Sequence, residues 1–430
     1  MTADRSRSAA TSEGTFALGN RQYALGGVAL ALVLAACAAP APDLAAGPEV
    51  MAGIDVLLEE HATMFAGQRV GLITNHTGTT ADGRSTIDAL AANPDIRLVA
   101  IFGPEHGLRG DTEAGEQVES GRDPVTGLSF RSLYGETRKP TAEMLADIDV
   151  LIFDIQDVGV RYYTYPWTMA LALQAAAETG RRFVVLDRPD PIGGDLVQGN
   201  VLDTAFATFV GLYPVPMRYG LTVGELAGLL NAEHGIGADL TVIPMRGWRR
   251  SMSFEETGLR WVAPSPNMPS VESATHYAGT CLFEGTNLSV GRGTPEAFTQ
   301  IGAPWLDAVA LVGRLEARAI PGVRFDTTRF TPRSPGDGKY GEVAIPGIRF
   351  RVTDATRYDP TLAAVAALLE IRALHADSLT FRESHFDRLA GTDRLRLQVL
   401  DGVPLEDITR AWQPARDAFM RTRARFLLYN

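Results

Sequence analysis

Residues 149–155 read DVLIFDI, a short and almost continuous apolar run. Runs of this kind are typical of strands that are buried on both faces of a parallel sheet. Three similar runs lie around it, and helical stretches separate them: RVGLIT at 69–74, RLVAIF at 97–102 and RFVVLD at 182–187. This alternation predicts an α/β fold with a Rossmann-like, doubly wound sheet.

The segments between these runs carry helix patterns. Gly180 should stop one helix, because glycine readily adopts the left-handed conformation found at helix ends. Thr222 is expected to cap another helix through its hydroxyl group. The expected helices are residues 85–92, 141–148, 167–179 and 222–234, and a further strand is expected at 240–244.

A chain of 430 residues should hold two domains, since domains usually have roughly 100–200 residues. The proline-rich stretch PSPNMP at 264–269 marks the crossing between them. We expect the Rossmann-like domain at 51–262 and a smaller α+β domain at 263–430. Helices in the smaller domain are expected near 304–317, 362–375 and 415–428.

The N-terminal segment has the pattern of an export signal. Arg21 precedes an apolar run at 23–36 that is too short to span a bilayer but is typical of a signal-peptide core. The run ends in LAAC at 34–37, which resembles the site where bacterial lipoproteins are cut and acylated. A plain secretory signal cut near Ala39 is the alternative, and both versions export the protein.

The lipoprotein pattern predicts a signal peptide at 1–36, a lipid anchor on Cys37 and a tether at 37–50. Acyl chains on this cysteine would hold a soluble domain on the membrane. Alanine at position 38 favours the outer membrane, with the domain facing the periplasm.

The composition excludes several classes of protein. A net charge of -11 argues against nucleic acid as a partner, because phosphate binding needs a clustered basic surface. The two cysteines lie far apart and one belongs to the leader pattern, so no disulfide framework or cysteine metal site is expected. Cys281 is expected to be a small buried side chain.

Known catalytic motifs are missing. The first strand is followed by TNHTG at 74–78 and not by G-x-G-x-x-G, which removes the dinucleotide-binding signature. No phosphate-binding loop, S-x-x-K or G-x-S-x-G motif is present. The histidines form no H-E-x-x-H motif, although His76 and His106 could converge at neighbouring strand ends as metal ligands. We expect no cofactor and no metal.

After these exclusions, the carboxylates at strand ends are the candidate catalytic groups of this chain. Ligands of open α/β sheets bind beyond the carboxyl ends of the strands, where Glu105, Asp154 and Asp157 are expected to lie. Glycoside hydrolysis needs two such groups, one protonated and one ionised. A helix cap or a salt bridge to Arg109 is the alternative role of Glu105, and structural capping is the alternative role of the two aspartates.

A glycine-rich segment, LFEGTNLSVGRGT at 282–294, carries Glu284, Asn287 and Arg292. The guanidinium group of Arg292 could bind a substrate carboxylate with two hydrogen bonds. Turn formation alone would also explain the glycines.

Eight ordered segments resemble those of the NamZ-type exo-β-N-acetylmuramidases (glycoside hydrolase family 171, formerly a domain of unknown function). One departure is Asp190, where the resemblance leads us to expect asparagine. The segments are GLITNHTG at 71–78, FGPEHGLRG at 102–110, FDIQDVGVRY at 153–162, DRPDPIGG at 187–194, PSPNMP at 264–269, LFEGTNLS at 282–289, FDRLAGTD at 386–393 and FLLY at 426–429.

The resemblance implies release of N-acetylmuramic acid from the non-reducing ends of peptidoglycan fragments during cell-wall turnover. It also implies that the Rossmann-like domain and the smaller domain form a cleft between them. The glutamate of the family's Gly-Pro-Glu-His motif falls on Glu105.

Our mechanistic hypothesis makes Glu105 the general acid, tuned by His106. Asp154 or Asp157 would stabilise the oxocarbenium ion or orient the acetamido group of the substrate. One of Arg109, Arg161 and Arg292 would bind the lactyl carboxylate. The other expected substrate contacts are Tyr163 with its neighbours Tyr162 and Tyr165, and Asn75, His76, Asn267, Glu284 and Asn287.

Two other functions fit the same residues. A wall-fragment-binding lipoprotein without activity would tolerate the loss of Glu105. A metal-dependent amidase or deacetylase on the same polymer would need His76 and His106 as ligands and would stop when a chelator is added.

Overall fold

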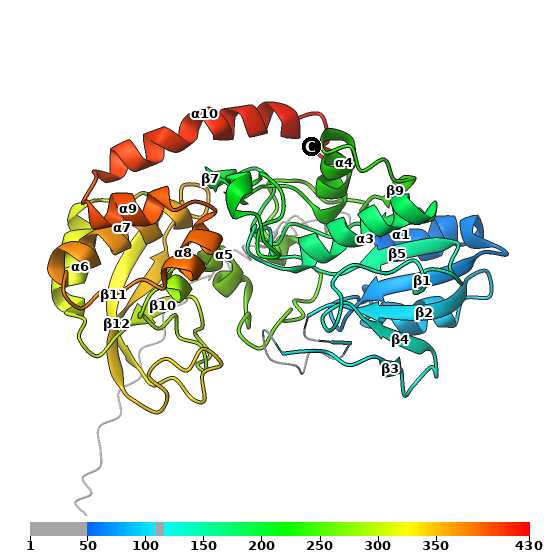
Figure 1. Ribbon diagram of the computed structural model, residues 1–430, viewed down its shortest axis with the longest axis horizontal. Coiled ribbons are helices and arrows are strands. Elements are labelled where there is room, and N and C mark those ends of the chain that lie inside the picture. The colour runs from blue at the N-terminus through cyan, green and yellow to red at the C-terminus, as the bar shows by residue number, and fades with distance from the viewer. Residues whose placement is uncertain (1–49, 106, 109–115) are drawn as a thin grey trace, which may run out of the picture. The chain divides into compact units, whose positions relative to one another are not determined.

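The computed structural model describes residues 50–105, 107–108 and 116–430 (Figure 1). The chain divides into two compact units, residues 1–47 and 48–430, and all described residues belong to the second. The expected signal peptide, Cys37 and all of the expected tether except Val50 therefore lie outside the described residues. Within these residues, no helix is long and apolar enough to cross a membrane.

A seven-stranded sheet forms the centre of the first part of the second unit. Neighbouring strands pair in parallel, except at the edge, where β3 and β4 are antiparallel. The edge strands were not predicted, because they are short and incompletely buried and so carry no apolar run. The order is β3 (Gly121–Arg122), β4 (Ser129–Ser132), β2 (Arg97–Gly103), β1 (Arg69–Thr74), β5 (Val150–Asp154), β6 (Arg182–Leu186) and β9 (Leu240–Ile243).

Helices cover both faces of this sheet, which confirms the doubly wound fold. Strand β5 shows the reason, since successive side chains of a strand point to opposite faces. Leu151 and Phe153 pack into one apolar cluster, and Val150 and Ile152 pack into another. The first cluster includes α3 (Tyr165–Thr179) and α4 (Val223–Glu233), and the second includes α1 (Gly53–Val56) and α2 (Thr86–Ala91).

Three of the four helices predicted in this part are confirmed. Helix α3 ends at Gly180, which is left-handed with φ 65°. Helix α4 begins with a capping box formed by Thr222 and Glu225. The helix expected at 141–148 was wrong, because that stretch contains only turns. Its backbone hydrogen bonds include turns between residues three apart, from Ala146 to Glu143 and from Ile148 to Leu145.

The second part is a smaller α+β region with an antiparallel sheet in the order β10-β12-β11. Its last helix, α10 (Leu405–Arg423), begins ten residues earlier than expected and contains Pro414. The strands are β10 (Gln300–Gly302), β11 (Val323–Phe330) and β12 (Ile345–Val352), and the other helices are α5 (Val271–Thr280), α6 (Ala308–Ala317), α7 (Pro360–Leu374), α8 (Glu383–Ala390) and α9 (Arg394–Leu400).

The two parts share one hydrophobic core, which contains Phe153 and Phe183 from the large sheet and Phe350 and Leu368 from the smaller region. Helix α10 runs from the smaller region across β7, against which it packs, and ends near α4 (Figure 1). Short elements complete the chain: β7 (Gln198–Val201), β8 (Pro216–Arg218), η1 (Leu57–His61), η2 (Ala62–Phe65), η3 (Thr204–Phe206), η4 (Glu255–Thr257) and η5 (Cys281–Gly285).

Candidate active site

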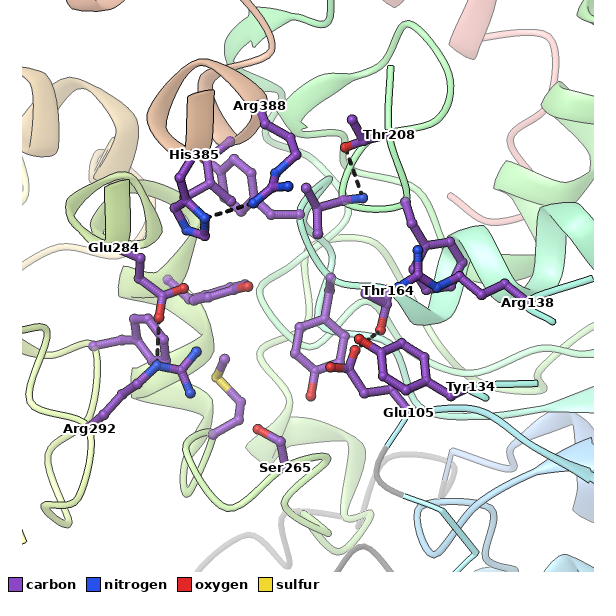
Figure 2. Close-up of a pocket in the computed structure, with 18 residues that line it drawn as sticks. Glu105, Tyr134, Arg138, Thr164, Thr208, Ser265, Glu284, Arg292, His385 and Arg388 are labelled. Carbon is purple, nitrogen blue, oxygen red and sulfur yellow. Dashed lines mark hydrogen bonds and ion pairs between the residues drawn. The ribbon is translucent and has the colours of Figure 1, made fainter. Parts of the chain in front are cut away.

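A pocket of about 390 Å³ lies between the two parts of the chain. Glu105, Tyr134 and Thr164 line it from the side of the large sheet. Glu284, Arg292 and His385 line it from the smaller region (Figure 2). Aromatic rings and a few charged groups thus surround one cavity, which is the usual composition of a small-molecule site.

Glu105 reaches the pocket from a tight turn at the end of β2. The N–H of Gly107 donates to the carbonyl oxygen of Pro104 at 3.1 Å, so the predicted turn is present. Gly107 has a φ of 69°, a conformation that favours glycine. A Cβ atom on Gly103 would lie 2.4 Å from the ring of Phe130, so a larger residue there would displace the turn. The local sequence therefore positions the Glu105 carboxyl group.

Hydroxyl groups surround this carboxyl group. Glu105 is only 7% exposed, and its Oε2 accepts a hydrogen bond from the Thr164 hydroxyl at 2.6 Å. Burial raises the pKa of Tyr134, and the negative charge of Glu105 raises it further. The Tyr134 hydroxyl therefore stays protonated and can donate. Neither Tyr134 nor Thr164 was predicted, because neither belongs to a recognisable motif.

The tyrosines expected to stack on sugar rings divide into two groups. Tyr162 and Tyr163 line the pocket, and both pack edge-on against Tyr277, at 5.8 and 6.0 Å between ring centroids. Tyr165 is buried, and its hydroxyl donates to the carbonyl oxygen of Pro264 at 2.7 Å. Tyr165 therefore stabilises the domain crossing and does not line the pocket.

The opposite wall carries an ion pair between Glu284 and Arg292. The Nε of Arg292 lies 2.5 Å from Oε1 of Glu284, and both side chains are 14% exposed. Burial alone would raise the pKa of Glu284, but the positive charge and hydrogen bond of Arg292 outweigh burial and lower it. Glu284 is therefore an ionised carboxylate in the pocket.

Lys339 fixes the loop that carries this carboxylate. Its Nζ donates to the carbonyl oxygens of Phe283, Glu284 and Leu288 at 3.2, 3.2 and 2.8 Å. Burial lowers the pKa of Lys339 to about 8. The glycine-rich segment is thus held by a buried ammonium group from a distant part of the chain.

His385 and Arg388 of α8 complete this wall. A nitrogen of the Arg388 guanidinium group lies 2.8 Å from Nδ1 of His385. The helix packs closely on η5, because a Cβ on Gly285 would lie 2.5 Å from the Cα of Phe386. The segment FDRLAGTD contains Arg388, but only the packing of α8 shows that its side chain lines the pocket.

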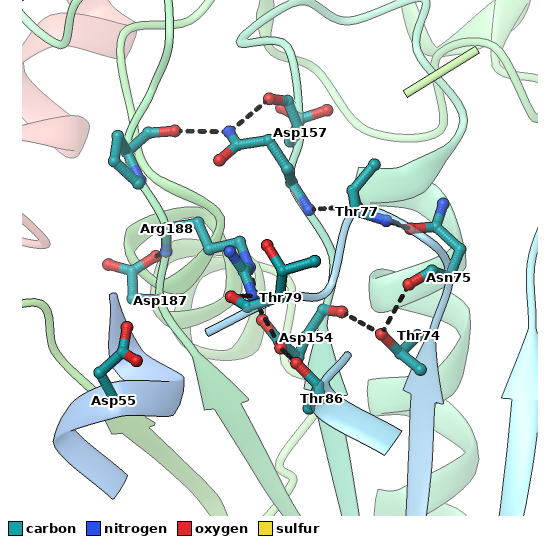
Figure 3. A network of polar contacts seen from close by, with 12 residues as sticks. Asp55, Thr74, Asn75, Thr77, Thr79, Thr86, Asp154, Asp157, Asp187 and Arg188 are labelled. Atoms are coloured by element: carbon teal, nitrogen blue, oxygen red, sulfur yellow. Dashed lines mark hydrogen bonds and ion pairs between the residues drawn. The ribbon is translucent and has the colours of Figure 1, made fainter. Parts of the chain in front are cut away.

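Asp154 lies at the end of β5, inside a closed network (Figure 3). Its side chain is fully buried, with Oδ1 2.6 Å from Nε of Arg188 and Oδ2 2.9 Å from Nη2 of the same residue. The hydroxyl of Thr86 also donates to Oδ2. Asp154 does not line the pocket, so its geometry favours the structural alternative.

Asp157 is also buried and lies outside the lining of the pocket. Its Oδ2 accepts hydrogen bonds from the N–H of Gly159 at 2.9 Å and from the hydroxyl of Tyr219. Burial raises its pKa to about 6, although these hydrogen bonds oppose that rise. The cap of a tight turn is the role that these contacts support.

Two family models match this chain. The model described as "Exo-beta-N-acetylmuramidase NamZ, N-terminal" matches residues 70–272, and the corresponding C-terminal model matches residues 275–429. The chain belongs to the NamZ family. The resemblance expected from the sequence motifs is thereby confirmed.

Individual relatives agree with this NamZ assignment. "Peptidoglycan beta-N-acetylmuramidase NamZ" of Bacillus subtilis (strain 168) is 44% identical over 383 residues, which is 89% of this chain and 92% of that protein. A crystal structure of a DUF1343 family protein from Bacteroides fragilis NCTC 9343 is 38% identical, with a TM-score of 0.83 over 89% of this chain and 99% of that one. A second DUF1343 structure from that strain is 30% identical, with a TM-score of 0.69 and the same coverage.

One arginine expected to bind substrate in this NamZ-family chain has another role. Arg161 is fully buried, and its guanidinium group donates to the carbonyl oxygens of Asn200, Val215, Leu389 and Ala390 at 2.8 to 3.1 Å. Burial lowers its pKa to about 10. Four backbone oxygens bond to its two terminal nitrogens and Arg161 does not line the pocket, so these contacts favour a structural role over binding of a substrate carboxylate.

Other predicted contacts also lie away from the pocket lining. The side chain of Asn287 bonds to the backbone of Ser378 and Thr380 and so ties two loops together. Asn75 accepts from the backbone and hydroxyl of Thr77, and Nε2 of His76 lies 2.7 Å from the carbonyl oxygen of Ala263. Asn267 is buried, while Ser265 and Met268 of the same stretch line the pocket. His106 and Arg109 lie outside the described residues.

No group of three histidine, cysteine, aspartate or glutamate side chains that could hold a metal ion occurs among the residues that the structure describes. Cys281 is a buried free thiol, as expected. The described lining of the pocket carries carboxylates, guanidinium groups, tyrosines and the imidazole of His385.

Proposed function

We propose that this chain is an exo-β-N-acetylmuramidase that hydrolyses the β-1,4 bond and releases N-acetylmuramic acid from the non-reducing ends of peptidoglycan fragments. The observation that carries the proposal is that Glu105, the glutamate of the NamZ-type motif, lines the pocket as a buried carboxyl group. The pocket volume of about 390 Å³ lies at the small end of the range for ligand sites, roughly 300–1,000 Å³, which suits one terminal sugar.

Glu105 would act as the general acid. A glycosidic oxygen leaves poorly unless it is protonated as the bond to the anomeric carbon breaks. The Thr164 hydroxyl, 2.6 Å from Oε2, would hold the carboxyl group in one orientation during that transfer. Water would then add to the anomeric carbon, so that each new sugar end receives a hydroxyl group.

Glu284 would act as the ionised partner. Among the described lining residues it is the second carboxylate, and Arg292 keeps its pKa low. A negative charge near the anomeric carbon would stabilise the oxocarbenium-like transition state or orient the acetamido group. This assignment replaces Asp154 and Asp157 as the preferred second group, because neither aspartate lines the pocket and Asp154 is paired with Arg188.

The test uses the compact unit from residue 48 onward and two substrates that differ in leaving group. One is a disaccharide of N-acetylmuramic acid and N-acetylglucosamine, and the other is a dinitrophenyl β-N-acetylmuramide. Glu105→Gln should lower kcat on the disaccharide by roughly 10²–10⁴-fold. It should lower kcat on the dinitrophenyl substrate far less, since dinitrophenolate leaves without a proton. Glu284→Gln should lower both.

The exposed Glu143, which lies outside the pocket, supplies the control variant Glu143→Gln. If the wild-type chain bound the disaccharide but released no sugar, a binding protein would replace the proposed enzyme. If activity disappeared with a chelator, a metal-dependent amidase or deacetylase would replace it.

We also propose that the protein is exported and lipid-anchored through Cys37 in the outer membrane, facing the periplasm. The support is the LAAC pattern at 34–37 and the alanine at 38. Labelling cells with a radioactive fatty acid should mark the wild-type chain and leave Cys37→Ser unmarked. Unlabelled wild-type protein in the soluble periplasm would favour the plain secretory signal.

A further inference from the structure

The described lining of the pocket carries more positive than negative charge. Glu105 and Glu284 are its carboxylates, whereas three arginines line it: Arg138, Arg292 and Arg388. One positive charge is therefore left over within this part of the lining when Glu105 is ionised, and two are left over while Glu105 holds the proton of a general acid. Such a pocket is complementary to a substrate that carries one carboxylate.

Two of the three guanidinium groups already have defined contacts. Arg292 forms the close ion pair with Glu284. Arg138 stacks over the rings of Tyr134 and Phe209, at 5.3 and 4.6 Å from their centroids. Arg138 therefore lies on the same side of the pocket as Tyr134, whose pKa responds to Glu105.

Arg388 differs from both. Its side chain is exposed, and its hydrogen bond to another described side chain is the one to Nδ1 of His385. A guanidinium group only donates hydrogen bonds, so this ring nitrogen must accept. Burial and then the charge of Arg388 lower the pKa of His385. The neutral ring therefore carries its proton on Nε2 and is a second donor.

The position of this pair fits the shape of the sugar. Figure 2 shows His385 and Arg388 across the pocket from Glu105. In N-acetylmuramic acid the lactyl ether is attached to carbon 3, two ring atoms away from the anomeric carbon that the general acid serves. A group that binds the lactyl carboxylate should therefore lie away from the acid, on the wall where Arg388 lies.

We propose that Arg388, supported by His385, binds the lactyl carboxylate and so makes the pocket selective for N-acetylmuramic acid over N-acetylglucosamine. The inference rests on the proposed function, because it concerns the sugar that the enzyme releases. In this proposal Arg388 binds the lactyl carboxylate, whereas the sequence led us to expect Arg109, Arg161 or Arg292 in that role.

Arg161 has a positioning role in this arrangement. Its guanidinium group donates to the carbonyl oxygens of Leu389 and Ala390 at the end of α8. A Cβ on Gly391 would lie 3.0 Å from the same guanidinium group, so glycine permits this approach. The helix that carries Arg388 is thereby fixed to the large sheet domain that carries Glu105.

The experiment compares dinitrophenyl β-N-acetylmuramide with its lactyl carboxamide, which has the same shape but no charge. Wild-type enzyme should lose roughly 10- to 100-fold in kcat/KM on the carboxamide, the usual size of a charge-assisted hydrogen bond. Arg388→Met should lose as much on the acid and no more on the carboxamide. The loss should appear in KM, since this contact is distant from the reacting bond. Arg388→Lys should retain part of the activity.

Arg394→Ala is the matched control, since Arg394 is an exposed arginine outside the pocket lining. The inference is overturned if Arg388→Met keeps the wild-type preference for the acid, or if Arg138→Met and not Arg388→Met abolishes it. If the proposed function itself is wrong, the wild-type chain will hydrolyse neither substrate, and this result distinguishes the two cases.

Discussion

The carboxylates at the ends of β2 and β5 look alike in the sequence but have different surroundings in the folded chain. Glu105 and Asp154 both follow or end an apolar strand of one parallel sheet. Asp154 is neutralised by two hydrogen bonds from the Arg188 guanidinium group and is closed off. Glu105 faces a pocket and receives a hydroxyl hydrogen bond. A buried carboxylate is thus available for catalysis only where its neighbours leave it open to a pocket.

Removing the charge of Asp154 should lower the stability of the fold more than removing the charge of Glu105. Asp154→Asn would leave the buried guanidinium group of Arg188 without its counter-ion, which typically costs about 3–5 kcal/mol of unfolding free energy. Urea unfolding followed by circular dichroism measures this loss. Glu105→Gln is the comparison and should change stability by about 1 kcal/mol or less. If Asp154→Asn were fully stable but inactive, Asp154 would belong to the catalytic groups after all.

Asp190 is a third buried carboxylate, and unlike Asp154 it has a hydrogen-bond partner in the described part of the chain for only one of its oxygens. Its Oδ2 has no hydrogen-bond partner among the described residues, and burial raises its pKa to about 7. A raised pKa in the folded chain means that stability is highest when the group is protonated and falls as pH rises from about 4 through 7.

Asp190→Asn, the residue that the family resemblance leads us to expect, should therefore stabilise the chain more at pH 8 than at pH 5. We expect a difference of roughly 1–3 kcal/mol, which thermal unfolding at the two pH values can measure. Because Asp157 lies close and its pKa is about 6, Asp157→Asn should show a shift in the same direction. An equal effect of Asp190→Asn at both pH values would contradict the proposed cause.

The smallest expected effect concerns the hydroxyl group that holds Glu105. Thr164→Val keeps the shape of the side chain but removes the donor to Oε2. Loss of one such bond should lower kcat about tenfold with little change in KM, because hydrogen bonds to charged groups contribute roughly 1.5–3 kcal/mol. Thr168→Val, one turn later on α3, removes a hydroxyl that bonds only to backbone and should keep kcat. Equal kcat values for both variants would show that the Thr164 hydroxyl does not position Glu105 for catalysis.

Much of the fold follows from local patterns. The apolar runs predicted five strands of the large sheet, because full burial on both faces requires apolar side chains in succession. They missed β3 and β4, which lie at the exposed edge. The turn around Glu105 was also predictable, since Gly103 and Gly107 are needed by close packing and a positive φ.

Local patterns in the chain were thus enough to predict five strands of the large sheet, the turn that presents Glu105 and the resemblance to the NamZ family. Which charged groups are open to the pocket and which are paired depends on contacts between distant segments of the folded chain. Arg188 neutralises Asp154 from another strand end, backbone oxygens occupy Arg161, and Glu284 meets Glu105 across one pocket. The physical reason is that a charge is compensated by whatever lies within a few ångströms of it. Such neighbours are separated by tens to hundreds of residues along the chain, so no local pattern records them.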